Sequence, residues 1–222
     1  MSKDILKIEE EKTIDFEFDL IRRNNELAEE NRRIFLENGV RAFDIMGSVG
    51  SGKTSLIENI VKILNGKYSI AVINGDLATT IDAERISKYG VKVIQINTGK
   101  ECHLDANIVR KAIEKIDLKS INVLFIENVG NLICPSDFKL GVEKRVVVVS
   151  VTEGEHVIIK HPLTFLEADI IVVNKIDLAE IMGVDVKKIV KDAKSINPKV
   201  KVVETSCKTG LGIDEVIRCL EL

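Results

Sequence analysis

Seven short runs rich in Ile and Val recur along the chain, and the intervals between them are long enough for helices. The runs span residues 42–46, 70–73, 91–96, 123–126, 146–151, 170–173 and 200–203. Continuous apolar runs of this length are typical of strands that are buried on both faces of a parallel sheet. Because 222 residues suffice for one domain with a fully buried sheet but not for two typical domains, we expect a single core.

Helical stretches are predicted between the runs, at residues 55–64, 78–88, 104–116, 184–196 and 212–220. This alternation predicts an α/β fold with a mostly parallel sheet flanked by helices and right-handed crossovers. Residues 15–38 differ, because they contain no Gly or Pro and mix apolar residues with dense charge. They predict a long amphipathic helix outside the sheet. We therefore expect residues 1–38 to form a helical extension packed on a core domain of residues 39–222.

Composition excludes several classes of protein. The 32 Lys and Arg residues nearly balance the 35 Asp and Glu residues, so no excess charge points to nucleic acid or to an anionic membrane. No apolar stretch approaches the roughly 18 to 20 residues of a membrane span, and the start lacks the apolar core of a signal peptide. A cytoplasmic protein is expected. Its four cysteines are not needed as a disulfide framework, so metal binding or burial explains them better.

A phosphate-binding loop is predicted directly after the first run. Residues 47–54 read GSVGSGKT and match the pattern G-x-x-x-x-G-K-[ST] between a strand and a helix. Glycines let successive N–H groups point at a phosphate, and the amino end of the following helix adds a favourable dipole. We expect Lys53 to pair with the β- and γ-phosphates and Thr54 to coordinate Mg²⁺. The predicted contacts are Gly47, Ser48, Val49, Gly50, Ser51, Gly52, Lys53, Thr54 and Ser55.

A second motif predicts which base is bound. Asn174, Lys175 and Asp177 form N-K-x-D after the run 170–173, at the carboxyl edge where open α/β sheets bind ligands. This motif resembles the one with which GTP-binding proteins read guanine, where the aspartate accepts hydrogen bonds from N1–H and the exocyclic amine. Adenine offers no such pair of donors. Ser206, Cys207 and Lys208 follow the last run and resemble the loop that covers the guanine O6.

Two acidic residues end other strands at the same edge. Asp76 is expected to help Mg²⁺ or the attacking water, and Glu127 to contact Mg²⁺ through water. Glu127 begins E-N-V-G in the place of the usual D-x-x-G, which makes Gly130 the expected sensor of the γ-phosphate. Lys53, Asp76 and Glu127 are therefore the predicted catalytic residues, and Thr54, Asp76 and Glu127 the predicted magnesium ligands. Surface carboxylates at strand ends remain the alternative.

Cys102, His103 and Cys134 are the candidate ligands for a softer metal. Two thiolates and an imidazole suit Zn²⁺ or Ni²⁺, but a closed site needs a further ligand from water or from a second copy of the chain. The alternative is that these are a buried small residue, a helix-start residue and a strand-end hydrophobe. His156 and His161 are interpreted as loop histidines, and Cys219 as a small buried hydrophobe.

Several segments together resemble one family. They are residues 75–85 (GDLATTIDAER), 97–106 (NTGKECHLDA), 127–132 (ENVGNL), 151–155 (VTEGE) and 174–178 (NKIDL). They are similar to the HypB family, the GTPases of hydrogenase nickel insertion, over nearly the whole chain. The resemblance implies a P-loop NTPase fold that binds GTP or GDP. It also implies a metallochaperone that pairs around nucleotide as a GTP-favoured homodimer.

The resemblance further implies hydrogenase maturation partner proteins and the hydrogenase large subunit precursor as partners. Many family members carry a nickel-binding cysteine motif or histidine tract near the N-terminus, whereas here the first Cys is Cys102 and the first His is His103. Nickel handling must then fall to the GTPase domain or to a partner protein. Alternatives are the related urease accessory G protein, a metal store in which nucleotide is only a structural latch, and a small-molecule kinase.

Overall fold

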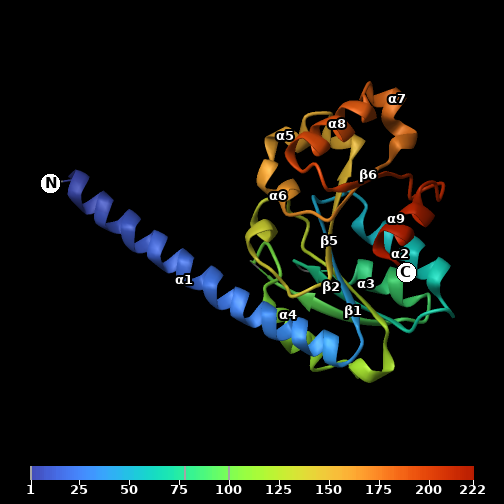
Figure 1. Cartoon of the computed structure of the whole chain (residues 1–222), viewed down its shortest axis with the longest axis horizontal. Coiled ribbons are helices and arrows are strands. Elements are labelled where there is room, and N and C mark those ends of the chain that lie inside the picture. The colour runs from blue at the N-terminus through green and yellow to red at the C-terminus, as the bar shows by residue number, and fades with distance from the viewer. Residues whose placement is uncertain (1, 78, 100) are drawn as a thin grey trace.

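The computed structural model describes residues 2–77, 79–99 and 101–222, with side chains from Phe18 onward. Seven parallel strands form one sheet in the order β3-β2-β4-β1-β5-β6-β7 (Figure 1). The strands are β1 (Arg41–Gly47), β2 (Ile70–Asp76), β3 (Lys92–Asn97), β4 (Val123–Glu127), β5 (Lys144–Ser150), β6 (Ile170–Asn174) and β7 (Lys201–Glu204). All seven predicted strands are thus present, with ends that shift by at most three residues.

Helices cover both faces of this sheet. They are α1 (Ser2–Glu37), α2 (Lys53–Leu64), α3 (Ile81–Ser87), α4 (Ala106–Ile113), α5 (Val157–Lys160), α6 (Pro162–Leu166), α7 (Ala179–Met182), α8 (Val186–Ile196) and α9 (Ile213–Leu220). Alternate residues of each central strand point to opposite faces. In β5, for example, Val146 and Val148 pack with α2 and α9, whereas Val147 and Val149 pack with α5, α6 and α8.

Some helices differ from the prediction. The first runs from Ser2 to Glu37, longer than expected. The third begins at Ile81, after the non-helical Thr79 and Thr80, and its predicted start at Ala78 lies outside the described residues. Helix α4 begins at Ala106 rather than 104, since the Asp105 side chain accepts a hydrogen bond from Ile108 N and caps the helix there. Periodicity did not predict α5, α6 or α7, which are only four or five residues long.

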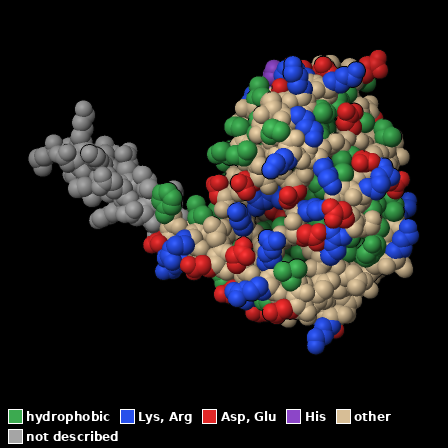
Figure 2. Space-filling model, in the orientation of Figure 1, with side chains coloured by type: hydrophobic (Ala, Val, Ile, Leu, Met, Phe, Trp, Pro, Cys, Tyr) green, Lys and Arg blue, Asp and Glu red, His purple; other side chains and the backbone are tan. Residues whose placement is uncertain are grey.

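The C-terminal part of α1 lies against the body of the protein beside α4, and the helix extends outward toward its N-terminal end (Figure 1). Phe35 of α1 is buried in the apolar cluster that α4 and strands β1, β2 and β4 also form. Figure 2 shows acidic and basic side chains interspersed over the visible face of the described residues. No described helix combines the length and the apolar character that crossing a lipid bilayer requires.

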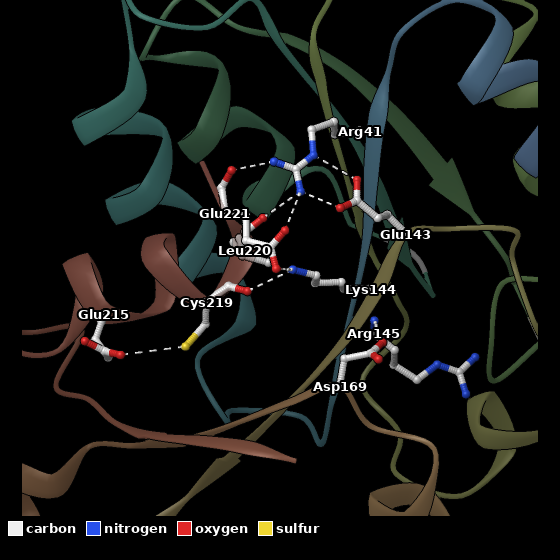
Figure 3. Close-up of polar contacts among 9 residues, drawn as sticks. All are labelled: Arg41, Glu143, Lys144, Arg145, Asp169, Glu215, Cys219, Leu220 and Glu221. Atoms are coloured by element: carbon white, nitrogen blue, oxygen red, sulfur yellow. Dashed lines mark hydrogen bonds and ion pairs between the residues drawn. The ribbon is translucent and has the colours of Figure 1, made fainter. Parts of the chain in front are cut away.

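The amino ends of the strands are held together by a charged cluster near the C-terminus (Figure 3). Arg41 donates to the backbone carbonyls of Leu220 and Glu221 and pairs with Glu143. Lys144 donates to the Cys219 carbonyl at 3.1 Å. This cluster lies at the end of the sheet opposite to the phosphate loop, so Cys219 belongs to the scaffold, as predicted.

Candidate nucleotide and metal site

The loop between β1 and α2 has the backbone that a phosphate cradle needs. Gly47, Gly50 and Gly52 all have positive φ angles, and that of Gly52 is 104°. A Cβ on Gly52 would lie 2.2 Å from Nδ2 of Asn174, so only glycine fits there. The loop borders a cavity of about 400 Å³. Residues lining this cavity include Val49, Gly50, Gly52, Lys53, Thr54, Ser55, Asp76, Glu127 and Gly130.

Lys53 is folded back into this loop. Its side chain is 7% exposed, and Nζ donates to the carbonyls of Gly47 and Ser48 at 3.1 Å each. Burial lowers the pKa of Lys53, because the ammonium group loses water, and the nearby Glu127 opposes this shift. The hydroxyl groups of Ser48 and Ser51 are buried without a hydrogen-bond partner among the described residues. Unsatisfied donors around a lysine are the groups that a phosphate would satisfy.

Glu127 ends β4 between β1 and β2, because it is in register with Ile45 on one side and Asn74 on the other. Its carboxylate accepts hydrogen bonds from Thr54 Oγ1 at 2.6 Å and from Asn74 Nδ2 at 2.8 Å. Burial raises the pKa of Glu127 to about 7, although the Thr54 hydroxyl and Lys53 oppose this shift. Glu127 therefore contacts the predicted magnesium ligand Thr54 directly. A hydroxyl beside carboxylates is an oxygen donor set that fits Mg²⁺.

Asp76 and Gly130 border the same cavity. Asp76 is the last residue of β2, and its carboxylate accepts a hydrogen bond from the Thr79 hydroxyl. Gly130 packs on the phosphate loop so closely that a Cβ would lie 2.5 Å from Cγ2 of Val49. A bulkier residue at 130 would displace the loop, so the segment after β4 is packed directly against the phosphate loop.

The structure adds cavity residues that the motifs did not predict, two of them on α3. Asp82 and Arg85 of α3 line the cavity. Arg85 pairs with Glu58 and with Asp82, and it donates to the Ser55 hydroxyl at 3.1 Å. Both positions lie within the 75–85 segment of the family resemblance, but no spacing rule marked them, because α3 reaches the phosphate loop only through tertiary packing.

The predicted base-reading residues lie beside the phosphate loop but differ in exposure. Asn174 is buried, donates to the Ser51 carbonyl at 2.9 Å, and accepts from Thr205 Oγ1 and Cys207 N. Its side chain thus joins the phosphate loop to the loop after β7 through hydrogen bonds. Lys175 has a left-handed backbone, with φ 62°, and its Nζ donates to the Gly50 carbonyl at 2.6 Å. Asp177 is exposed and is not among the residues that line the phosphate cavity.

The loop after β7 is hydrogen-bonded to Asn174 and does not line the phosphate cavity. Ser206 is 1% exposed, Cys207 is half-buried and Lys208 is exposed. Burial raises the pKa of the Cys207 thiol to about 11, so the thiol stays protonated at neutral pH. Because the Cys207 N–H is bonded to Asn174, the loop and the N-K-x-D segment are positioned as one unit.

Cys102, His103 and Cys134 come together at a neighbouring position. Cys102 Sγ lies 3.6 Å from His103 Nδ1, and a hydrogen bond with Cys134 raises the pKa of the Cys102 thiol. The His103 ring packs on Phe138 with 4.0 Å between centroids, and desolvation lowers the pKa of His103. Cys134 begins a 3₁₀ helix, η2 (Cys134–Asp137), so the alternative of a strand-end hydrophobe is wrong.

The donor atoms suit a soft metal, but the geometry is incomplete. Within the part of the chain that the structure describes, no group of three or more His, Cys, Asp or Glu side chains is arranged to hold a metal ion. His156 and His161 are the residues that flank α5 at its two ends. His156 is exposed, and its ring lies 3.3 Å from the Glu155 carboxylate. They are not near Cys102, in agreement with their interpretation as loop histidines.

A buried polar network connects the two sites. Asn128, directly after Glu127, accepts a hydrogen bond from Leu104 N at 3.0 Å and donates to Asp44 at 3.2 Å. Asp44 pairs with Arg145 at 3.2 Å, and both side chains are buried. Arg145 in turn donates to the carbonyls of Ser136 and Phe138, at 2.9 and 3.0 Å. The network thus holds the segments that follow Cys102 and Cys134.

A parallel sheet with this loop between its first strand and helix defines a P-loop NTPase. Residues 42–204 match the model of the CobW/HypB/UreG nucleotide-binding domain. The chain is 53% identical over 208 residues to the probable hydrogenase maturation factor HypB of Methanocaldococcus jannaschii, covering 94% of each protein. The chain therefore belongs to the HypB family of hydrogenase maturation factors.

Two solved structures agree with this assignment. HypB from Archaeoglobus fulgidus is 48% identical, with a TM-score of 0.85 over 90% of this chain and 98% of that one. HypB from Helicobacter pylori, solved in complex with nickel, is 33% identical, with a TM-score of 0.85 over 90% of this chain and 94% of that one. The α/β fold predicted from the sequence and the family resemblance are confirmed.

Proposed function

We propose that this protein is a GTP-hydrolysing metallochaperone that assists nickel insertion into [NiFe]-hydrogenase. One observation carries the proposal. Two consecutive residues at the end of β4 contact different segments, since Glu127 accepts from Thr54 of the phosphate loop while Asn128 accepts from Leu104, next to His103. A nucleotide-dependent change at this strand end would therefore reach both sites. A metal store in which nucleotide is only a structural latch would not need this connection.

The residues at the phosphate site have separate roles. Lys53 exchanges the carbonyls of Gly47 and Ser48 for the β- and γ-phosphates. Thr54 and Glu127 would hold Mg²⁺, with Asp76 nearby, and the bound ion supplies charge neutralisation at the phosphate oxygens. Asp76 orients the attacking water, and Gly130 follows the γ-phosphate through its contact with Val49.

Nickel is the cargo in this proposal, held by Cys102, His103 and Cys134. Because these side chains do not form a complete site in one chain, a second copy supplies the missing ligands across a two-fold axis. Zn²⁺ can compete for the same thiolates. The partners are a second copy of the chain, the hydrogenase maturation proteins and the hydrogenase large subunit precursor. The names of the relatives support this client.

The preference for GTP can be tested by changing the carboxylate of Asp177. Asp177→Asn replaces an acceptor of two hydrogen bonds with an amide that can donate to a carbonyl. Xanthine carries a carbonyl where guanine has its amine, so this variant should lose GTP affinity by at least tenfold and gain XTP affinity, because an unpaired polar group costs on the order of 1–3 kcal/mol. Nucleotide dissociation constants measured by calorimetry, together with phosphate release, report both effects.

Asp192→Asn serves as the matched control, because Asp192 lies on α8 outside the phosphate cavity. It should bind and turn over GTP as the unmodified protein does. If Asp177→Asn keeps full GTP affinity, or if the unmodified protein prefers ATP, guanine recognition by this motif is disproved.

A further inference from the structure

Two asparagines on α1 are buried where an amphipathic helix normally places apolar residues. Asn24 is 6% exposed and Asn31 is 0% exposed. They are seven residues apart, so they project from the same face of the helix, together with the buried Ala28 and Phe35. An amide is costly to bury unless it is hydrogen-bonded, and apolar side chains would pack there at no such cost. The hydrogen-bond partners of these amides therefore show which segments of the protein α1 holds in place.

Each asparagine bridges the same two segments. Asn24 accepts from Ala106 N at 2.8 Å and donates to the Lys139 carbonyl at 2.8 Å. Asn31 donates to the Ala106 carbonyl at 2.8 Å and to the Leu140 carbonyl at 3.3 Å. Both backbone polar groups of Ala106 are thus bonded to α1, and α1 joins them to the chain at 139–140.

The two bridged segments are those that carry the candidate metal ligands. Ala106 begins α4, three residues after His103 and four after Cys102. Lys139 and Leu140 follow η2, which begins at Cys134, and they come directly after Phe138, the residue on which the His103 ring packs. The α1 amides therefore fix the separation of the two ligand-bearing segments.

The fit of α1 on the second segment is close. Gly141 has a φ of +86°, and a Cβ there would lie 2.1 Å from the Ala28 carbonyl. On the other side, Arg110 of α4 donates to Asn31 Oδ1 at 2.7 Å and pairs with Glu30 at 3.1 Å. These contacts fix the register of α1, so its amides cannot slide to other partners.

We infer that Asn24 and Asn31 are positioning residues of the metal site, and that α1 acts as a clamp on the segments bearing Cys102, His103 and Cys134. Neither amide touches the metal. They hold the two backbone segments that carry the three side chains at a fixed separation. This inference rests on the proposed role of these three residues in binding nickel. It extends the metal site to helix α1, which lies outside the sequence motifs.

The test uses Asn24→Asp in the full chain. The carboxylate still accepts from Ala106 N at the amino end of α4, where negative charge is favourable, but it cannot donate to the Lys139 carbonyl. The variant therefore keeps α1 docked on α4 while removing one of the two amide hydrogen bonds to the second segment. Equilibrium dialysis with Ni²⁺, followed by the thiolate-to-nickel charge-transfer absorbance, should show an affinity about tenfold or more weaker, as for other supporting partners of metal ligands.

Two further variants complete the test. Asn24→Ala/Asn31→Ala should weaken Ni²⁺ binding further, and circular dichroism checks that it is folded. Asn25→Ala removes an amide from the neighbouring position, where Oδ1 is buried without a hydrogen-bond partner among the described residues, and it should bind Ni²⁺ as the unmodified protein does. GTP affinity should stay unchanged in all three, because α1 does not line the phosphate cavity.

The outcomes separate the inference from the function on which it rests. If the unmodified protein binds Ni²⁺ and Asn24→Asp binds it with the same affinity and absorbance, the inference is wrong while the proposed function stands. An equal loss in Asn25→Ala also contradicts it, because the effect would then be general destabilisation of α1. If the unmodified protein binds no Ni²⁺ through these cysteines, the proposed function fails and the inference fails with it.

Discussion

Glu127 is the residue of the phosphate site whose pKa is strongly raised. Its folded pKa of about 7 lies above the ordinary value of 4.5, because burial disfavours the charge. The uncharged form thus stabilises the fold fully below pH 4.5, and this contribution is lost as the pH rises through 7. Bound Mg²⁺ would reverse the preference, since a cation favours the carboxylate.

Glu127→Gln should therefore remove a pH dependence from the protein without nucleotide or metal. The amide imitates the neutral acid, because its carbonyl still accepts from Asn74 Nδ2 and its NH₂ group can donate to the Thr54 hydroxyl oxygen. Between pH 5 and pH 8 the variant should gain up to about 3 kcal/mol in unfolding free energy relative to the unmodified protein, at 1.36 kcal/mol per pKa unit. Urea denaturation at both pH values measures this difference.

The exposed Glu180 supplies the control, because Glu180→Gln should leave the pH profile unchanged. A constant stability difference between Glu127→Gln and the unmodified protein from pH 5 to pH 8 would contradict the raised pKa. With Mg²⁺ and GTP present, the same variant should be the weaker binder, because the amide is a poorer ligand for a hard cation.

At the scale of elements, β1 and β5 are joined through a buried ion pair as well as by backbone hydrogen bonds. Burial raises the pKa of Asp44, while Arg145 and Asn128 oppose the shift. Arg145 also supplies the donors for two carbonyls around η2. A buried pair contributes little net stability over apolar packing, but removing one partner leaves an uncompensated charge.

Asp44→Asn and Arg145→Met should each lower the unfolding free energy by roughly 3–5 kcal/mol. The double variant should lose clearly less than the two single losses combined, because no lone charge is left inside. Guanidinium denaturation of the four proteins gives this cycle. Arg218→Ala, at an exposed pair with Glu215, should change stability by less than about 1 kcal/mol. Additive losses in the cycle would show that the pair is not coupled.

At the scale of the whole molecule, metal binding and pairing of two chains should be linked. Ions that bridge two copies and prefer the GTP-bound dimer must also strengthen dimerisation. Sedimentation should show a larger dimer fraction with a non-hydrolysable GTP analogue than with GDP. Cys102→Ala and Cys134→Ala should abolish Ni²⁺ binding and leave nucleotide binding intact, whereas Cys219→Ala, far from the site, should retain both.

An unchanged monomer with either nucleotide would disprove the dimer model. Stoichiometric Ni²⁺ in both cysteine variants would instead disprove the ligand assignment. The two measurements are independent, so one part of the proposal can fail while the other survives.

The sequence by itself determined the strands, the sheet class and the phosphate loop. Burial on both faces forces continuous apolar runs, and a loop that approaches a phosphate requires glycine at Gly47 and Gly52, so both features leave a local pattern. The same pattern placed Glu127 and Asp177 at one edge, because the carboxyl ends of parallel strands share that edge. The family followed from longer segments, such as residues 97–106.

Only the tertiary structure decided which distant groups touch. Asn174 is predicted from the sequence to contact nucleotide, and the structure adds that its side chain joins two loops through hydrogen bonds. Arg85 joins the phosphate cavity because α3 packs beside α2. Asn24 and Asn31 resemble ordinary polar residues of an amphipathic helix until their partners at Ala106 and 139–140 are seen. Hydrogen bonds between residues some 75 to 115 positions apart leave no periodic trace in a sequence, because their geometry exists only after the chain has folded.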